Sequence, residues 1–209
     1  MLFRSRRKPQ RGSYDRSRAH AILDEGLVAH VGIVVEEQPF VIPMVYARLG
    51  DTLYLHGAPA SRLLRNLAEG VPVAVTVTLL DGLVFARSAF HHSMNYRSLV
   101  ILGVGREVTD EATKRRAFDA LVEHVSPGRS RVARTATHGE LRGTCVIEVP
   151  IEEASVKQRT GGPVDLEADL TWPVWAGVVP LQVTRCEPQV DDGVDPSHAA
   201  PAAPAQRNR

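Results

Sequence analysis

The chain lacks several features that would assign it to a common class at once. No apolar run reaches the roughly 18 residues that a membrane-spanning helix needs, and the basic N-terminus is not followed by the apolar stretch of a secretory signal. Only two cysteines occur, Cys145 and Cys186, and their spacing fits no metal or redox motif. We interpret them as a chance pair of buried thiols. We therefore expect a cytoplasmic protein with no membrane partner.

A strong charge of one sign is also absent. The net charge of +1 disfavours a dedicated nucleic-acid binder, which needs a broad basic face. With 44% hydrophobic and 23% charged residues, 209 residues suffice for one globular core. Residues 1–14 are rich in arginine, and we expect a basic mobile arm. Residues 187–209 are rich in proline and alanine, and we expect a disordered tail. The folded domain is then 15–186.

Familiar catalytic motifs are missing as well. The sequence contains no Gly-x-Ser-x-Gly elbow and no His-Glu-x-x-His pair. Gly103 and Gly105 lack the third glycine and the following helix of a dinucleotide-binding fingerprint. The common hydrolase and nicotinamide-dinucleotide classes therefore have no support.

Strand patterns dominate what is present, and three helix patterns interrupt them. Strands adjacent in sequence are joined mostly by short turns, including an Asp81-Gly82 pair that is typical of a hairpin. This pattern favours an antiparallel barrel, mainly β with some α, over a doubly wound parallel sheet. We expect helices over 15–26, 61–69 and 111–125, and strands over 27–35, 40–48, 52–56, 71–80, 83–90, 96–106, 142–149, 153–159 and 174–183.

The segment 56–62 is the first with candidate chemistry. It follows a strand and opens a helix, and Ser61 is a favourable N-cap. Arg62 and Arg65 lie in the first turn, where the helix dipole disfavours cations by about 0.3–1 kcal/mol each. A bound phosphate would remove that cost. The alternative is that both arginines point to solvent.

The segment 90–98 is dense in hydrogen-bonding groups just before an apolar strand. His91 and His92 suggest a metal, but neighbouring strand residues face opposite ways and no third ligand stands at a recognisable spacing, so we predict no metal site. Ligation of haem by a histidine is possible on chemistry, although no motif supports it.

Two later segments are also candidates. Residues 157–163 place two cations before a glycine turn, which suits either an anion clamp or a plain surface loop. Residues 172–181 hold both tryptophans of a chain with only 5% aromatic residues. An indole there suits packing against a flavin ring, or equally packing in the core or at a dimer contact.

In their order and spacing these segments resemble the pyridoxamine 5′-phosphate oxidase-like flavoproteins, in particular the flavin-nucleotide-binding branch that includes the nitroimidazole-resistance proteins. The resemblance runs from about Asp15 to Leu181. It rests on residues 41–46 (VIPMVY), 53–57, 61–62, 95–98 leading to Gly103, 157–163 and 175–181. It implies a homodimer of six- to eight-stranded antiparallel split β-barrels with about three flanking helices, and FMN bound in clefts between the subunits.

The resemblance also implies roles for individual residues. The isoalloxazine would lie along one strand, and the phosphate would lie at the turn before the second helix. The strand residues are Pro43, Met44, Val45 and Tyr46; the phosphate residues are His56, Gly57, Ser61 and Arg62. Arg97 and Ser98, which follow Tyr96 in the predicted site, stand where the oxidases have an Arg-Gln pair that touches the flavin. Trp175, with Lys157 and Arg159, would close the site from the same or the other subunit.

Two departures from the oxidases bear on the reaction. Leu63 stands where the oxidases carry a lysine after their Ser-Arg pair, and their terminal Arg-Leu-His run is missing. Oxidation of pyridoxamine phosphate is therefore not the expected activity. We expect an FMN-dependent oxidoreductase acting on a small molecule, with no catalytic residue assigned beyond Tyr96 and His56 as proton donors by type. The alternatives are a flavin- or haem-binding module without turnover and a deazaflavin-dependent reductase.

Overall fold

A computed structural model describes residues 8–195, 197, 198 and 200. In this part of the chain, ten strands form one antiparallel sheet, and eight of them have four or more residues. The strands are β1 (Gly12–Ser13), β2 (Val28–Val35), β3 (Gln38–Leu49), β4 (Thr52–Gly57), β5 (Pro72–Phe85), β6 (Ser93–Val104), β7 (Arg106–Glu107), β8 (Cys145–Pro150), β9 (Glu153–Arg159) and β10 (Gly177–Pro180). The expected class, mainly β with α, is confirmed.

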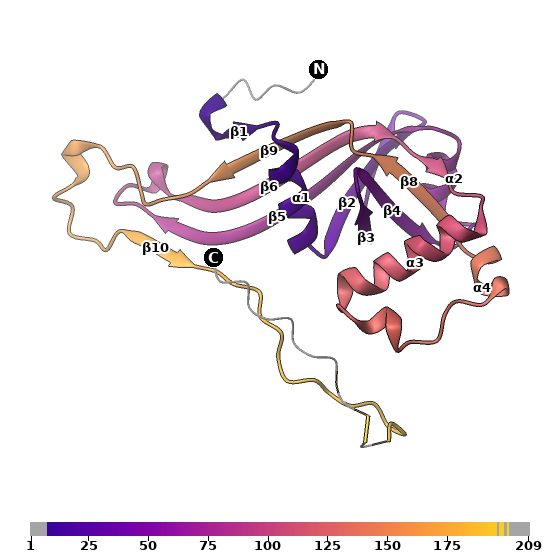
Figure 1. The fold of residues 1–209 in the computed structure, drawn as a ribbon. Helices are drawn as coiled ribbons and strands as arrows, with labels where there is room; N and C mark the ends of the chain where they lie inside the picture. Colours follow the sequence, from indigo (N-terminus) through magenta and orange to yellow (C-terminus); the bar gives the residue numbers. More distant parts are fainter. Residues whose placement is uncertain (1–7, 196, 199, 201–209) are drawn as a thin grey trace.

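The strand order is β1-β9-β6-β5-β2-β3-β4-β8-β7, with β10 paired to β5. The two end strands of this path do not pair with each other, so the barrel is split rather than closed. The strands β5, β6 and β9 extend together beyond the barrel, and β10 lies along the far end of β5 (Figure 1). We call this extension, made of residues 79–98, 157–163 and 172–180, the arm.

Four α-helices accompany the sheet in the described residues: α1 (Arg16–Glu25), α2 (Arg62–Ala68), α3 (Glu111–Val125) and α4 (His138–Arg142). The first three match the predicted helices, and Asp15 caps α1 as its position before the helix suggests, by accepting from the amide of Ser17. The fourth helix was missed, although the capping box of Thr137 and Glu140 that begins it is readable in the sequence.

The predicted hairpin at Asp81-Gly82 is wrong. Strand β5 continues through both residues, and the register with β6 shifts between Leu80 and Gly82, so Asp81 is an extra residue in a β-bulge. The actual connection between β5 and β6 lies at 86–92 and contains a 3₁₀ turn at Ala89–His91. An Asp-Gly pair suits a two-residue turn, but here β2 and β10 pair along the same strand on either side of the bulge.

The core fills the barrel and is sealed by α1. Ile22 and Leu23 of α1 are almost fully buried among Val77, Leu99 and Ile101 of the long strands. A smaller cluster lies under α3, where Ala117 and Phe118 pack on Tyr54, Val108 and Val146. In the part of the chain that the structure describes, no helix combines the length and apolar character needed to cross a bilayer.

The two ends of the chain were predicted to lie outside the folded domain. In the predicted basic N-terminal segment 1–14, residues 8–13 include a 3₁₀ turn at Pro9–Arg11 and the strand β1, which pairs with β9. Residues 1–7 of that segment lie outside the described residues. Of the predicted 187–209 tail, 196, 199 and 201–209 lie outside them too, and 187–195 form no helix or strand. Cys145 is buried, but Cys186 is exposed, which corrects the expectation of two buried thiols.

Candidate functional site

One face of the sheet points away from the core, and we call it the outer face. Side chains alternate between the two faces of a strand, so residues paired with each other across neighbouring strands share a face. Val28 pairs with Val45 and His30 with Pro43, and all four are exposed. Val34 and Val41 on the same face are 58% and 61% exposed. This apolar stretch of β2 and β3 is unusual for a surface that faces only water.

The four predicted residues of β3 divide between the two faces. Pro43 and Val45 lie on the outer face, and Met44 packs against the core from the other side. Tyr46 is fully buried, and its hydroxyl donates to the carbonyl oxygens of Leu23 and Gly26 at 2.8 and 2.9 Å. A planar ring lying on this strand would therefore meet Pro43 and Val45, and Tyr46 only through its backbone.

The turn before α2 presents an exposed cation. Ser61 is the N-cap residue by backbone conformation, but its hydroxyl forms no cap hydrogen bond. The guanidinium of Arg62 lies 5.2 Å from the ring centroid of Phe40, a cation–π contact that fixes its direction. It forms no ion pair with any residue in the described ranges. Ser61 and Arg62 together can bind a phosphate by a hydroxyl and a permanent charge.

His56 faces away from this turn. It lies on β4 beneath α3, where its ring meets Phe118 edge-on at 5.7 Å. Its Nδ1 is buried and has no hydrogen-bond partner among the residues that the structure describes. Burial lowers the pKa of His56, because the charged imidazolium loses its hydration. Gly57, the next residue, does point toward α2: a Cβ there would approach Leu64 at 3.0 Å, so glycine allows the close contact.

Arg97 is committed to partners within the chain. Its guanidinium donates to both oxygens of Asp81, at 2.9 and 2.8 Å, and also binds Glu25 of α1. These carboxylates, Asp81 first, raise the pKa of Arg97. The neighbouring residues Tyr96 and Ser98 are half-buried on the outer face, and Ser98 donates to the carbonyl of Lys157 at 3.3 Å.

Of the two β9 cations predicted to clamp an anion, Arg159 is engaged within the chain and Lys157 is not ion-paired with a described residue. Arg159 is 6% exposed, and its guanidinium donates to the side chain of Asn95 and to the carbonyls of Gly161 and Gly162, so it holds the glycine turn. Lys157, two residues earlier, is half-buried. Its side chain forms no ion pair with any of the described residues.

Trp175 stands at the far end of the arm. It is 65% exposed, and its ring centroid lies 5.8 Å from that of Phe85. A Cβ on Gly177 would come within 2.8 Å of the indole, so only glycine lets the ring fold back here. In Figure 1, β10 and α2 lie at opposite ends of the molecule. Within one chain, the predicted residues of β3, β4 and α2 are thus separated from Trp175.

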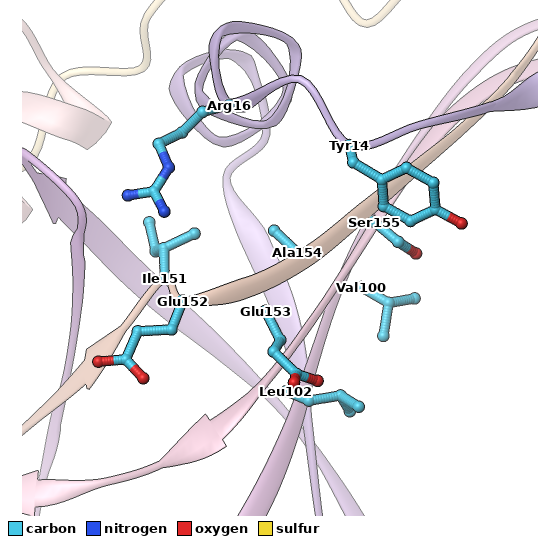
Figure 2. Close-up of a pocket in the computed structure, with 9 residues that line it drawn as sticks. All are labelled: Tyr14, Arg16, Val100, Leu102, Ile151, Glu152, Glu153, Ala154 and Ser155. Carbon is cyan, nitrogen blue, oxygen red and sulfur yellow. The ribbon is translucent and has the colours of Figure 1, made fainter. Parts of the chain in front are cut away.

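Neither of two cavities in the described structure contains a predicted residue. The larger, of about 300 Å³, lies at the edge of β9, where Tyr14 and Arg16 face Glu152 and Glu153 across the strand (Figure 2). The other, of about 200 Å³, lies between α3 and α4. The predicted residues therefore form an open surface and not an enclosed pocket. No group of three potential metal-binding side chains occurs among the described residues.

Sequence reasoning missed the partners that immobilise these residues. Phe40, which orients Arg62, was read only as part of a strand, and Asp81, which binds Arg97, was read as a turn residue. Both contacts join residues that are far apart in the chain, so no local sequence pattern predicts them.

Comparison with known proteins assigns the family. A protein-family model described as pyridoxamine 5′-phosphate oxidase matches residues 15–158. The flavocytochrome Anf3 from Azotobacter vinelandii is 38% identical, with a TM-score of 0.87 over 94% of this chain and 92% of the other. The FAD and haem binding protein from Mycobacterium smegmatis is also 38% identical, with a TM-score of 0.87 over 91% and 94% of the two chains.

A third solved structure is more distant. A putative 5-nitroimidazole antibiotic resistance protein from Bacteroides thetaiotaomicron is 26% identical, with a TM-score of 0.60 over 70% of this chain and 85% of the other. No curated protein matches the chain. A match over 94% of the chain must include most of the segment after residue 158, which the family model leaves out. The likeness to the flavocytochrome therefore extends beyond the segment that the family model matches.

Proposed function

The chain belongs to the pyridoxamine 5′-phosphate oxidase family, and from that premise we propose that it binds a flavin nucleotide and works as an oxidoreductase on a small molecule. The observation that carries the proposal is the cation at the start of α2, held by an aromatic ring and left without a carboxylate partner in the described structure. The likeness to two proteins named for flavin or FAD, each 38% identical over more than nine tenths of this chain, supports it.

The nucleotide phosphate is bound by Arg62 and Ser61. Arg62 is charged at every physiological pH and can form two parallel hydrogen bonds to phosphate oxygens. Its contact with Phe40 holds the guanidinium before the ligand arrives, which lowers the entropy lost on binding.

The isoalloxazine lies on the outer face along β3. Pro43 and Val45 offer it an apolar floor, with Val28 and His30 beside them on β2. An apolar floor excludes water from one side of the ring, and it leaves the ring edges free for backbone donors and acceptors. When bound, the flavin supplies a centre that accepts a hydride or an electron pair.

A second copy of the chain completes the site. In one chain, Lys157 of β9 and Trp175, two residues before β10, belong to the arm, and Figure 1 shows β10 and α2 at opposite ends of the molecule. A symmetric pair that buries the exposed valines of the outer face can bring the arm of each copy to the barrel of the other. The site then gains a cation and an indole that the single chain does not provide.

Two nucleotides, FMN and FAD, are candidates for the bound flavin. The sequence resemblance points to FMN, whereas the protein from Mycobacterium smegmatis is described as binding FAD. The distinction depends on whether the surface beyond Arg62 accepts an adenosine. Arg65, exposed one turn further along α2, is the nearest additional cation on that helix.

A second candidate function is binding of haem together with flavin. It is favoured by the coverage of the flavocytochrome, which includes most of the segment after residue 158. Under this candidate the protein passes electrons between two cofactors.

A fluorescence titration with FMN and with FAD tests the flavin proposal. Wild type is expected to quench flavin emission to a saturable end point with at least one nucleotide. Arg62→Ala is expected to weaken that binding by roughly 10- to 150-fold, the equivalent of about 1.5–3 kcal/mol for a charge-assisted contact. In the FMN titration, Arg65→Ala, the same charge change on the same helix, serves as the control. Equal losses in both variants would show that Arg62 makes no specific contact.

A further inference from the structure

The larger cavity of the described structure lies where the edge of β9 loses its strand partner. Strand β1 pairs with β9 only at Val156 and Lys157, so residues 153–155 have no strand beside them on that edge in the described part of the chain. After β1 the chain turns away at Tyr14 and enters α1, which begins at Arg16. The gap between these segments is the cavity of about 300 Å³, a volume at the lower end of the range of small-molecule sites.

One wall of this cavity is apolar and half-buried. It consists of Val100 and Leu102 on the outer face of β6, whose partners on β9 are Ser155 and Glu153. The ring of Tyr14 lines the cavity beside Ser155 (Figure 2). Aliphatic and aromatic groups in this arrangement can bury the aliphatic part of a ligand.

The charged side chains of the lining carry opposite signs and do not pair with each other. Arg16 donates from Nη1 to Asp51 at 2.6 Å, and its Nε and Nη2 form no hydrogen bond with a described residue. The carboxylates of Glu152 and Glu153 form no hydrogen bond or ion pair with a described residue either. A ligand that carries both charges can therefore bind both sides of the cavity through charge-assisted hydrogen bonds.

A metal ion suits this lining less well than an organic zwitterion. No group of three potential metal-binding side chains occurs among the described residues, and the guanidinium of Arg16 repels a cation. An ammonium group, in contrast, has three donors that two carboxylates can accept. Nε and Nη2 of a guanidinium bind a carboxylate by two parallel hydrogen bonds.

We infer that the cavity binds a free α-amino acid with an aliphatic side chain. The ammonium group of the amino acid binds the carboxylates of Glu152 and Glu153, and its carboxylate binds Nε and Nη2 of Arg16. Its side chain packs on Val100 and Leu102.

This amino-acid site is separate from the proposed flavin site. Strands β6, β5 and β2 lie between β9 and β3. At a spacing of about 4.8 Å between neighbouring strands, the distance along the sheet is about 19 Å. An amino acid in the cavity is therefore out of reach of a ring on β3 of the same chain, and the inference does not rest on flavin binding.

Isothermal titration calorimetry of the full chain with three ligands of similar shape tests the assignment of charges. L-leucine carries both charges, isoamylamine lacks the carboxylate, and isocaproate lacks the ammonium group. L-leucine is expected to bind saturably, and each analogue is expected to bind at least roughly tenfold more weakly, because it loses charge-assisted hydrogen bonds. Absence of saturable leucine binding, or an analogue that binds as tightly as leucine, would overturn the inference.

Single variants test whether leucine binds in this cavity. Glu153→Gln and Arg16→Gln are each expected to weaken leucine binding roughly tenfold. Glu153→Gln breaks no described hydrogen bond or ion pair, so a loss of binding in this variant is not the result of a broken internal contact. Glu167→Gln, the same change at an exposed residue outside the cavity, is the matched control and is expected to bind as wild type. Unchanged binding in Glu153→Gln, or an equal loss in Glu167→Gln, would contradict the inference.

Discussion

Arg97 and Asp81 form a bidentate ion pair, with guanidinium-to-carboxylate distances of 2.9 and 2.8 Å, at the bulge of β5. The pair is well shielded, with 19% of the Arg97 side chain and 13% of the Asp81 side chain exposed. Glu25 adds a second carboxylate from α1. One contact therefore fixes both the position of the bulge and the orientation of an arginine for which the family resemblance suggests a place near the flavin.

The first prediction concerns this pair. Arg97→Ala is expected to lower the free energy of unfolding by about 1.5–3 kcal/mol, because Asp81 keeps its charge in a shielded place after losing both hydrogen bonds from the guanidinium. Urea denaturation measures the change. Arg97→Lys, which keeps the charge but not the fork of donors, is expected to lose less. An Arg97→Ala protein of wild-type stability with weakened flavin binding would instead assign Arg97 to the cofactor.

The second prediction concerns Tyr46. Tyr46→Phe removes the donor to the carbonyls of Leu23 and Gly26 inside the core. The expected loss of stability is about 1–3 kcal/mol, the cost of leaving a buried acceptor unsatisfied. Tyr54→Phe is the matched control, since Tyr54 is 8% exposed and its hydroxyl has no hydrogen bond to a described residue. Equal effects in the two variants would contradict the assignment.

The third prediction concerns acid stability at α4. Arg134 and then Thr137 lower the pKa of Glu140 to about 2. A carboxyl group whose pKa falls on folding stabilises the protein above its unfolded value of 4.5, and that contribution disappears as the pH drops from 4.5 toward 2. Glu140→Gln should therefore lower stability at neutral pH and flatten its decline over that interval, as measured by urea unfolding at several pH values. Glu152→Gln is the control, and an identical acid profile in Glu140→Gln and wild type would refute the prediction.

The fourth prediction concerns the tryptophans of the arm. In the proposed two-chain site the indole of one copy would close the site of the other, so Trp175→Ala is expected to change the emission of bound flavin by removing a contact that quenches the ring. Trp172→Ala removes an indole that is 63% exposed and should leave the emission unchanged. Steady-state fluorescence of the flavin-loaded variants measures both, and identical spectra for Trp175→Ala and wild type would assign Trp175 to packing alone.

Much of the fold is readable from local patterns. The three longer helices and most strands follow from periodicity and caps, since those signals act within a few residues. The continuity of β5 cannot be predicted from such local signals. It depends on Arg97, β2 and β10, which are all distant in sequence from the Asp81-Gly82 pair. Tertiary pairing overrides turn propensity there.

The site is less readable than the fold. The exposed cation of Arg62 could be anticipated from its place at a helix start, but the burial of Tyr46 and Arg159 could not. Both residues have polar tips that suit ligand binding, and both use those tips to satisfy backbone carbonyls.

Identification of the small molecule that the purified protein releases on denaturation is the sharpest test of flavin binding. Absorption and mass spectra of the released material should reveal FMN or FAD at close to one molecule per chain, and anaerobic addition of a nicotinamide donor to the intact protein should bleach the flavin band if that donor is used. A protein that carries no flavin as purified and binds neither FMN nor FAD when they are supplied would contradict the account.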